Sequence, residues 1–408
     1  MLTSGKGNAM TSYISNSFLI QPNTKQSEFI DQSVQVGSVK HNRYSCKIYV
    51  CKFTMFVTCF LIFILSTPIA EINCGLFNIF DPKVDGNVYQ MWDLLFLLTK
   101  NNIKFLLSGK DSTPIEQAVT FWCANSESRV LQQAFPNNSR IKHNINPTKP
   151  MHIITHGWLD NPNRNWVQAT ARNLLEHLDT NVCIVGWRNL AHYYYSLTAR
   201  VHTVKVSTHL TQFIGYLNDL GLPLKNITLI GHSLGAHISG QVGHNFHGQI
   251  GAIYGLDPPE LLFSVARGHQ FRLDRSDARY VQMIIVTRNA GGLRRPDGHE
   301  NFFPNGGVFP QPNCVLPLFE SAEFSDLLFC SHLHVTTLFR LSIVPGNAFV
   351  GRECESYGAF LHKLCASDRT NRLGIYSDRS GGDFYLKTSW FSPFVSSKNE
   401  RFLPKMVS

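Results

Sequence analysis

The chain has 408 residues, of which 43% are hydrophobic, 12% aromatic and 16% charged. This length allows one large domain or two ordinary ones with a sizeable core. The composition is not that of a disordered chain and no internal repeat is visible, which excludes those two classes. The net charge of +9 comes from scattered basic residues rather than a band. It therefore predicts no nucleic-acid partner, although a mildly basic surface would help adsorption to anionic lipid.

An apolar run from Met55 to Ala70, "MFVTCFLIFILSTPIA", follows the basic residues Lys47 and Lys52. A basic flank, a short apolar region and a small residue at its end are typical of a signal peptide. The uncharged stretch 53–70 is also at the lower length limit for a membrane span, so an uncleaved signal anchor is the alternative. We favour a signal peptide that naturally starts at Met55, because segment 1–52 is polar and is expected to be disordered. The rest of the chain should then be secreted, or held at the membrane if the anchor is retained.

Placement in the secretory lumen favours disulfides, because that compartment is oxidising. Seven cysteines follow the apolar run: Cys74, Cys123, Cys183, Cys314, Cys330, Cys354 and Cys365. The last four form closely spaced pairs, and we predict the disulfides Cys314–Cys330 and Cys354–Cys365. Cys183 lies in the strand-like run "NVCIVGW" and is predicted to be a buried free thiol. Cys74 and Cys123 could pair, although sequence alone does not fix connectivity.

Two sequons, Asn137-Asn-Ser and Asn226-Ile-Thr, would accept N-linked glycans in the same compartment. Sequons also occur by chance, so their support for secretion is mild. They make Asn137 and Asn226 candidate glycosylation sites.

After Pro150, short apolar runs alternate with segments of helical spacing. The expected strands are 151–158, 181–187, 226–231, 250–257 and 278–287, and the expected helices are 165–178, 201–220 and 233–244. This alternation predicts an α/β fold with a mostly parallel central sheet covered by helices on both faces. One α/β domain, placed at residues 71–400, accounts for the chain after the apolar run. In such a sheet, functional residues gather at the carboxyl ends of strands, where His156, Gly157, Ser233 and Asp257 fall.

The stretch "LIGHSLGAHIS", Leu229 to Ser239, places a serine between two glycines where a strand ends and a helix begins. A Gly-x-Ser-x-Gly pattern often arises by chance, but this context is that of a nucleophile elbow. Gly231 and Gly235 let the strand and the helix pack closely around a strained turn. The turn would hold Ser233 at a helix N-terminus, which favours developing negative charge. An ordinary strand-to-helix turn is the alternative.

A serine hydroxyl needs a base, and the base needs an acid that orients it. In folds with this elbow, the chain order is serine, acid, histidine. Asp257 ends the next strand beside the elbow, although an aspartate that merely terminates the strand before Pro258 is the alternative. Among the later histidines, His332 stands in "FCSHLHVTTLF", where a helix begins and a disulfide could anchor it. His237, one turn into the elbow helix, is expected to pack against the sheet.

The sequence does not predict metal chemistry. It contains no HExxH pattern and no paired CxxC pattern. His332 and His334 are two residues apart, which places them on different helix faces and argues against a metal pair.

Five motifs occur in a fixed order: "GHSLGAH", "GLDP", "RLDRSDARYV", "GHENFFPNGG" and "CSHLHV". In this order they resemble the pancreatic lipase family over roughly residues 75 to 395, and most closely its insect secreted neutral lipases and phospholipase A1-type enzymes. The resemblance implies an α/β-hydrolase fold, with Ser233 as nucleophile, Asp257 as acid and His332 as base. It also implies an oxyanion hole at the backbone N–H groups of Leu234 and Trp158. Each such donor is typically worth ~3–4 kcal/mol to the transition state.

The chain also departs from the family. Its digestive members continue into a C-terminal β-sandwich that binds a colipase, whereas this chain ends at Ser408, so neither that module nor a colipase partner is expected. Asp274 and Asp277 match family calcium ligands, but His269 stands where a glutamate is expected. Calcium is therefore a doubtful cofactor and no other is predicted; the two aspartates are expected instead to cap a loop. Gly186 stands where the family usually has Asp, with no predicted effect.

The segment between Cys314 and Cys330, "VLPLFESAEFSDLLF", is expected to form an amphipathic lid over the site. Acidic residues recur every three positions opposite an apolar stripe: Glu320, Glu323 and Asp326 against Phe319, Phe324, Leu327 and Leu328. A surface helix of no special role is the alternative. This lid is shorter than in the digestive triacylglycerol lipases, and the loop between Thr287 and Gly298 is also trimmed. In this family both features favour phospholipase A1 activity.

The expected substrate is therefore an acyl ester of a lipid at a membrane or lipid-droplet surface, and triacylglycerol lipase and phospholipase A1 both remain open. A non-catalytic lipid-binding or storage protein of the same fold, as the insect yolk proteins illustrate, is the alternative. Loss of the triad residues would mark that class, and all three candidates are present here.

Overall fold

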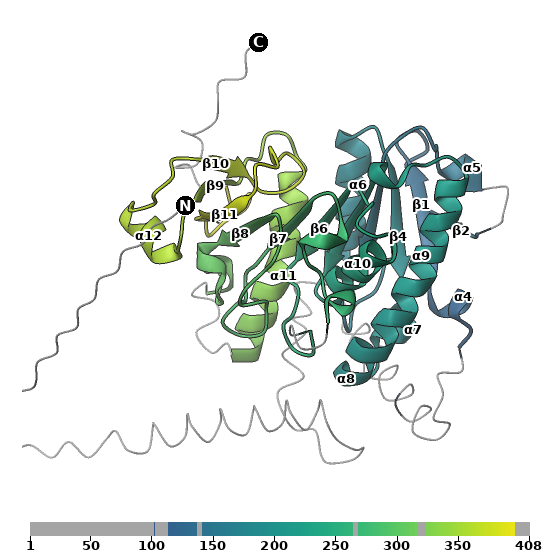
Figure 1. Ribbon diagram of the computed structural model, residues 1–408, viewed down its shortest axis with the longest axis horizontal. Helices are drawn as coiled ribbons and strands as arrows, with labels where there is room; N and C mark the ends of the chain where they lie inside the picture. Colours follow the sequence, from purple (N-terminus) through teal and green to yellow (C-terminus); the bar gives the residue numbers. More distant parts are fainter. Residues whose placement is uncertain (1–101, 103–112, 137–140, 264–267, 316–323, 396–408) are drawn as a thin grey trace, which may run out of the picture. The chain divides into compact units, whose positions relative to one another are not determined.

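The computed structural model describes residues 102, 113–136, 141–263, 268–315 and 324–395 (Figure 1). The strands are β1 (Thr120–Asn125), β2 (Gln132–Ala134), β3 (Met151–Thr155), β4 (Asn181–Gly186), β5 (Ile227–His232), β6 (Ala252–Leu256), β7 (Val281–Ile284), β8 (Glu300–Pro304), β9 (Val350–Glu353), β10 (Thr370–Arg372) and β11 (Gly382–Leu386). The α-helices are α4 (Ile115–Ala118), α5 (Ile141–Asn144), α6 (Asn165–His177), α7 (Arg188–Ala191), α8 (Tyr195–Leu197), α9 (Thr203–Asp219), α10 (Leu234–Asn245), α11 (Phe324–Ser342) and α12 (Tyr357–His362). A π turn, η2 (Thr198–His202), and the 3-10 turns η3 (Leu224–Asn226), η5 (His269–Phe271), η6 (Arg275–Asp277), η7 (Asn305–Gly307) and η8 (Pro312–Cys314) complete the described elements.

All the strands belong to one 11-stranded sheet, in the order β10-β9-β11-β8-β7-β6-β5-β3-β4-β1-β2. From β11 to β4 every neighbouring pair is parallel. Antiparallel strands extend the sheet on both sides, with β1 and β2 beyond β4 and with β9 and β10 beyond β11. Because parallel strands run the same way, their last residues share one edge of the sheet, here called the carboxyl edge. Their first residues share the opposite, amino edge.

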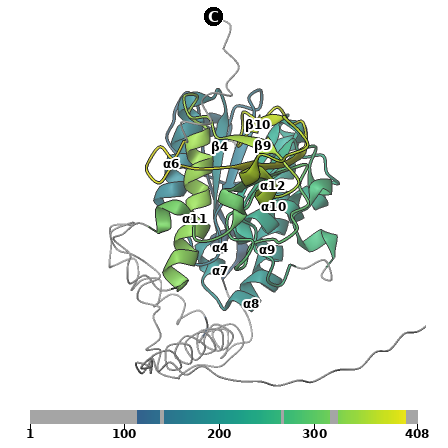
Figure 2. The same cartoon turned by 90° about the vertical axis from the view of Figure 1, so that its left-hand side faces the viewer.

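Helices cover both faces of the sheet, as the sequence predicts. In Figure 2, α6 and α11 lie on one side of the strands, and α9 and α10 lie on the other. Two separate apolar clusters correspond to these two layers. A strand buried on both faces must be apolar at consecutive positions, which explains the continuous apolar runs in the central strands.

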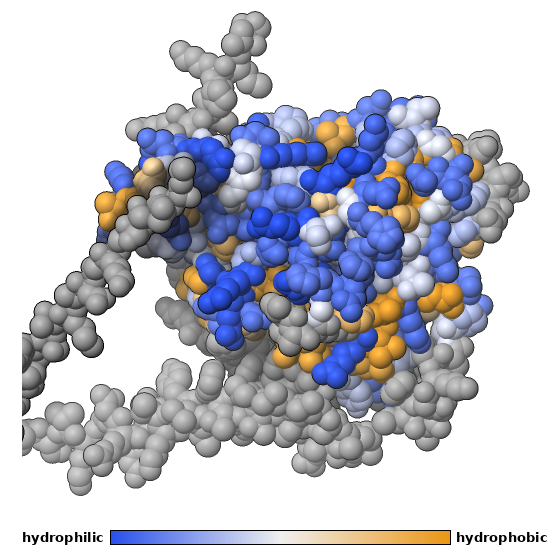
Figure 3. All heavy atoms as spheres, in the orientation of Figure 1, coloured by the Kyte–Doolittle hydropathy of each residue, from blue (hydrophilic) through white to orange (hydrophobic). Residues whose placement is uncertain are grey.

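Apolar side chains are also exposed near the carboxyl edge. Figure 3 shows apolar surface at the end of the domain where α7 and α8 lie. Val201 in η2 and Leu261 after β6 are 41% and 42% exposed, respectively. Single exposed apolar residues are ordinary, but several together at one edge are typical of a surface that meets another apolar phase.

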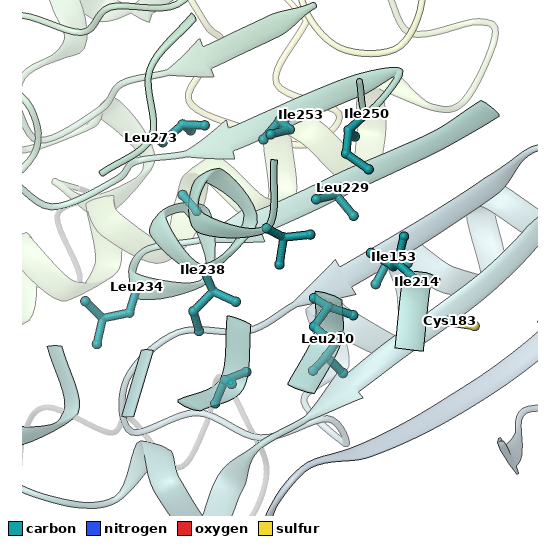
Figure 4. Close-up of a cluster of buried hydrophobic side chains, with 14 of the residues drawn as sticks. Ile153, Cys183, Leu210, Ile214, Leu229, Leu234, Ile238, Ile250, Ile253 and Leu273 are labelled. Carbon is teal, nitrogen blue, oxygen red and sulfur yellow. The ribbon is translucent and has the colours of Figure 1, made fainter. Parts of the chain in front are cut away.

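The two clusters draw on alternate residues of the same strands. In β5, Leu229 faces α9 and α10 while Ile230 faces α6 and α11. Figure 4 shows the first cluster, in which Leu210 and Ile214 of α9 approach the strand residue Ile153. This alternation follows from the period of two in a β-strand, and it fixes the register of the central strands.

The structure confirms the strands and helices expected after Pro150, with shifts of a few residues at their ends. Six further strands were not predicted from the sequence: β1, β2, β8, β9, β10 and β11. The predicted extension 1–52 and the apolar run 53–70 lie outside the described residues, as does most of the predicted lid. No helix in the described ranges is long and apolar enough to cross a membrane.

Three disulfides are present among the described residues. Cys314–Cys330 and Cys354–Cys365 join the pairs that the sequence predicts. The prediction for Cys183 was wrong, because it is bonded to Cys123 and is not a free thiol. A Cys74–Cys123 pair is thereby also contradicted. The reason is the register of β1 against β4, which places Cys123 directly opposite Cys183 with their Cα atoms 4.1 Å apart.

Candidate active site

Ser233 occupies a tight turn between β5 and α10 at the carboxyl edge. Its φ of 55° and ψ of −124° are strained values for a residue other than glycine. The turn depends on its glycines, because a Cβ on Gly231 would lie 2.2 Å from the carbonyl oxygen of Gly235. A Cβ on Gly235 would likewise lie 2.2 Å from the carbonyl oxygen of Thr155. The strand and the helix therefore pack backbone to backbone, and Ser233 is the N-cap residue of α10.

Asp257 follows β6 at the same edge and is fully buried. Its Oδ1 accepts hydrogen bonds from the backbone N–H groups of Val286 and Thr287, at 2.9 and 3.2 Å. Its Oδ2 accepts a hydrogen bond from the hydroxyl of Thr287 at 2.6 Å. A buried carboxylate without such donors would be strongly unfavourable. The segment that follows β7 therefore makes a negative charge tolerable at this position.

His332 lies on α11, and its Nδ1 donates to Oδ2 of Asp257 at 2.7 Å. Because an ionised carboxylate only accepts, Nδ1 carries the proton of the neutral ring and Nε2 keeps its lone pair. The disulfide Cys314–Cys330 attaches α11 to the end of η8, two residues before His332. The N–H of Gln311 also donates to the hydroxyl of Ser331 at 2.9 Å. These contacts fix the imidazole from both its own helix and the sheet.

His232, the residue before Ser233, joins the serine turn to the helix that carries His332. Its Nε2 donates to the carbonyl oxygen of His332 at 3.1 Å, and the two ring centroids are 4.6 Å apart. Burial lowers the pKa of His232 to about 3, so the ring is neutral near pH 7. We assigned no role to this residue from the sequence, where its place inside "GHSLGAH" is the one signal.

The turn after β3 lies directly against Ser233. A Cβ on Gly157 would lie 2.8 Å from the Cβ of Ser233, so this close approach requires glycine. His156 fixes the turn, since its Nδ1 donates to the Gly157 carbonyl at 3.0 Å and its Nε2 accepts the N–H of Trp187 at 3.3 Å. Burial lowers the pKa of His156 to about 4 and keeps the ring in the neutral form that this bonding needs. The turn thereby brings Trp158 to the border of the serine site.

The two backbone N–H groups named from the sequence lie on segments that border Ser233. Leu234 is the first residue of α10, where an N–H has no acceptor within its own helix. Trp158 is anchored through its indole, which donates to the carbonyl oxygen of Tyr193 at 2.8 Å. A hydroxyl, an oriented imidazole, a buried carboxylate and flanking backbone donors are the components of nucleophilic acyl transfer.

Asp274 and Asp277 form a cap on η6, which was the favoured alternative to calcium. The N–H of Ser276 donates to Asp274 and the N–H of Asp274 donates to Asp277, both at 2.9 Å. The second carboxylate oxygen of Asp274, Oδ2, forms a hydrogen bond of 2.6 Å with Nδ1 of His269. The unpartnered buried oxygen is Oδ1 of Asp277, whereas calcium takes six to eight oxygen ligands. The two aspartates alone supply too few free oxygens for the ion, and no step below uses calcium.

The structure gives the contacts of two other positions that the sequence singled out, His237 and Gly186. His237 was expected to pack against the sheet, but its ring stacks on Phe263 with centroids 3.9 Å apart, and its Nε2 donates to the Pro259 carbonyl at 2.8 Å. It ties α10 to the segment that follows Asp257. Gly186 has no room for a side chain, because a Cβ there would lie 2.7 Å from the hydroxyl oxygen of Thr120.

The candidate glycosylation sites lie away from the serine turn or outside the described chain. Asn226 ends η3 at the amino edge, directly before β5, and is half-buried. Asn137 falls outside the described residues. Glycosylation of Asn226 would therefore leave the carboxyl edge uncovered.

A family model described as "Lipase" matches residues 99–394. The chain belongs to the lipase family. Pancreatic triacylglycerol lipase of Mus musculus is 32% identical over 319 residues, which cover 72% of this chain and 65% of that protein. The human enzyme of the same name is 30% identical over 66% of this chain and 63% of its own length. Lipase member H of Oryctolagus cuniculus is 35% identical over 59% of this chain and 54% of its own length.

Family membership confirms the predicted resemblance to pancreatic lipases. Together with the mostly parallel sheet and its two helical layers, it also confirms the predicted α/β-hydrolase fold. The chain spans less than two thirds of the length of these three relatives.

His334 is buried two residues after His332. Its ring should make the stability of the protein depend on pH. His334 contacts Phe394 on another face of α11, its Nε2 has no partner, and burial lowers its pKa from 6.5 to about 4. The unfolded chain therefore binds a proton more readily, and stability is lost as pH falls from 6.5 to 4. His334→Leu removes this group. Between pH 7.5 and pH 5 the unfolding free energy of the variant should therefore fall by about 2 kcal/mol less than that of wild type.

Chemical denaturation of both proteins at pH 7.5 and pH 5 measures this difference. The same loss of stability in the two proteins between these pH values would contradict the assignment. Because the variant keeps His332 and Asp257 unchanged, the comparison isolates the buried ring.

Proposed function

We propose that the protein hydrolyses carboxylic esters of lipids through a Ser233–His332–Asp257 triad. The observation that carries the proposal is the 2.7 Å hydrogen bond between Asp257 and His332. The backbone carbonyl of His332 is in turn bonded to His232, the residue before Ser233. Membership of the lipase family supports the same reaction. The names of the relatives, pancreatic triacylglycerol lipase and lipase member H, point to lipid substrates for those proteins.

In the acylation step, Ser233 Oγ attacks the carbonyl carbon of the ester while Nε2 of His332 accepts its proton. The carbonyl oxygen gains negative charge, which the N–H groups of Leu234 and Trp158 would stabilise. Asp257 favours the imidazolium that forms, because its carboxylate holds the proton on Nδ1. The carbon–oxygen bond to the alcohol then breaks, and the alcohol leaves with the proton from Nε2.

Deacylation repeats these proton movements with water. A water molecule attacks the acyl-serine carbonyl and gives one proton to Nε2 of His332. The tetrahedral intermediate releases Ser233 Oγ, which recovers that proton, and the fatty acid leaves. The same two N–H donors serve both steps, so a rigid loop after β3 and a fixed start of α10 are useful throughout.

We further propose that the substrate is presented at a lipid surface. Exposed apolar side chains surround the segments that carry the site: Val201, Leu261, Val315 and Leu333, each between 37% and 43% exposed. Leu261 belongs to the wall of the site, because its carbonyl accepts the hydroxyl of Tyr195, whose ring packs against Trp158. An apolar rim around a buried polar triad suits an acyl chain better than a soluble ester.

Secretion is part of the same proposal. Three disulfides among the described residues fit an oxidising compartment. The apolar run 53–70 then serves as the signal peptide. A signal anchor would place the same domain on the outer side of a membrane.

Covalent labelling tests the enzyme against the alternative of a non-catalytic lipid-binding protein. A fluorophosphonate should label the folded protein at Ser233, as located by peptide mass spectrometry. Ser233→Ala should fold and be secreted normally but lose labelling, with turnover lowered by more than about 10³-fold. No labelling of the folded wild type would favour the storage alternative, and hydrolysis retained by Ser233→Ala would contradict the assignment.

A direct comparison of two lipids tests whether the protein is a phospholipase A1 or a triacylglycerol lipase. The disulfide-bounded lid is short, with a sequence separation of 16 between its cysteines, which favours entry of a polar head group. Phosphatidylcholine should therefore release its sn-1 fatty acid at least as fast as triacylglycerol releases fatty acid, both measured on mixed micelles by titration of released acid. Hydrolysis of triacylglycerol alone would reject phospholipase A1 activity while leaving the serine hydrolase intact.

A further inference from the structure

A separate hollow lies at the amino edge of the sheet, on the opposite side from Ser233. Its volume is about 580 Å³, and it is bordered by the first residues of β7, β8 and β11 together with the turns before them. Ser233 and Asp257 instead follow the last residues of β5 and β6, which run parallel to β7 and β8. Nothing in the proposed hydrolysis uses this hollow.

Three arginines line the hollow, two from the segment before β7 and one from the turn before β11. Arg275 is paired, since its Nε donates to Asp297 at 2.6 Å and a terminal nitrogen donates to the Gly298 carbonyl at 3.1 Å. Arg279 and Arg379 are both exposed. Within the described ranges, neither of these two guanidinium groups forms an ion pair with a carboxylate. Arg279 and Arg379 therefore bring two guanidinium groups to the hollow that are not held in ion pairs by the described residues.

The buried carboxylate of Glu300 fixes the turn that carries Arg379. Glu300 is fully buried, and its two oxygens accept the hydroxyl of Ser377 at 2.6 Å and the N–H of Gly381 at 3.1 Å. These bonds fix both ends of the turn that carries Arg379. The residue itself has a φ of 59°, a strained value for a side chain other than glycine. Strain of this kind persists where the surrounding contacts fix one geometry, which is common at binding sites.

Aromatic contacts orient the same group. The guanidinium of Arg379 lies over the ring of Tyr280, 4.9 Å from its centroid. The same guanidinium also interacts with the hydroxyl of Tyr254. Its remaining N–H groups are the ones that could donate hydrogen bonds to a ligand. Asp383, the carboxylate that lines the hollow, accepts a hydrogen bond from the side-chain amide of Asn301 at 2.8 Å. His299 accepts the N–H of Val281 through Nδ1 at 3.0 Å, so its Nε2 carries the proton of the neutral ring.

We propose that this hollow binds a phosphate group, held by the guanidinium forks of Arg279 and Arg379. Guanidinium groups match the oxygen spacing of phosphate and donate two parallel hydrogen bonds to it. The phosphate of a soluble ester and the phosphate of a lipid head group present the same chemistry to the two arginines. The site is distinct from the serine turn, so it binds phosphate whether or not the proposed hydrolysis is correct.

Isothermal titration of the full chain with inorganic phosphate and with glycerol 3-phosphate tests the site in solution. Wild type should bind at least one of them saturably, and Arg279→Ala should bind at least tenfold more weakly. Arg279 makes no side-chain bond in the described chain, so its loss should leave the fold intact. Arg129→Ala is the matched control, because it removes an exposed arginine that lies outside the hollow, in the turn after β1.

Sedimentation with vesicles distinguishes the lipid source. Vesicles of phosphatidylcholine with phosphatidic acid are compared with vesicles of phosphatidylcholine alone, for wild type, Arg279→Ala and Arg129→Ala. Binding that needs phosphatidic acid and is lost selectively in Arg279→Ala supports a lipid head group, and selective loss in the titration alone supports a soluble phosphate ester. Absence of saturable binding by wild type in both experiments, or equal weakening in Arg279→Ala and Arg129→Ala, would overturn the proposal.

Discussion

The buried hydrogen bond between Asp257 and His332 is the contact on which the rest of the site depends. It joins a strand end to a helix 75 residues later in the chain. The carboxylate is stable there because Val286 and Thr287 supply three further hydrogen bonds from the segment after β7. The end of β6 therefore carries the charged residue, and the segment after the neighbouring strand β7 donates the hydrogen bonds that stabilise its charge. The helix that carries His332 must then reach the same point, and the disulfide Cys314–Cys330 fixes it there.

Close backbone packing supplies the rest of the geometry. The serine turn fits between β5 and α10 only because two glycines replace side chains that would clash with main-chain oxygens. Gly157 brings the turn after β3 into contact with Ser233 in the same way. His156 and His232 then fix these turns through neutral rings whose pKa values are lowered by burial. Rigid backbone donors of this kind need no rearrangement when charge develops on a substrate.

The sequence predicted the parts of this arrangement that follow from periodicity and chain order. Apolar runs that alternate with helical spacing predicted the central parallel strands, and the order of Ser233, Asp257 and His332 placed them at one edge. Local pattern could not predict pairings set by register, which is why the Cys123–Cys183 bond was missed: its partners meet only after β1 pairs with β4. Nor could it predict His232 or Thr287, whose roles depend on contacts between segments far apart in the chain.

The molecule thus presents two chemically different edges. The carboxyl edge combines a buried carboxylate with exposed apolar residues, as hydrolysis of a lipid ester requires, and the amino edge carries arginines that a phosphate group would neutralise. The two sites lie at opposite edges of the same sheet. A ligand at one edge would therefore leave the other edge open to its own partner.

The kinetics of Asp257→Asn test the central claim most directly. Asparagine keeps the size of the side chain but removes the charge that holds the proton on Nδ1 of His332. If the carboxylate of Asp257 orients His332, kcat for a soluble short-chain ester should fall by roughly 10⁴-fold, while circular dichroism and thermal unfolding show a folded protein. A folded Asp257→Asn variant with near wild-type kcat would contradict this role of Asp257.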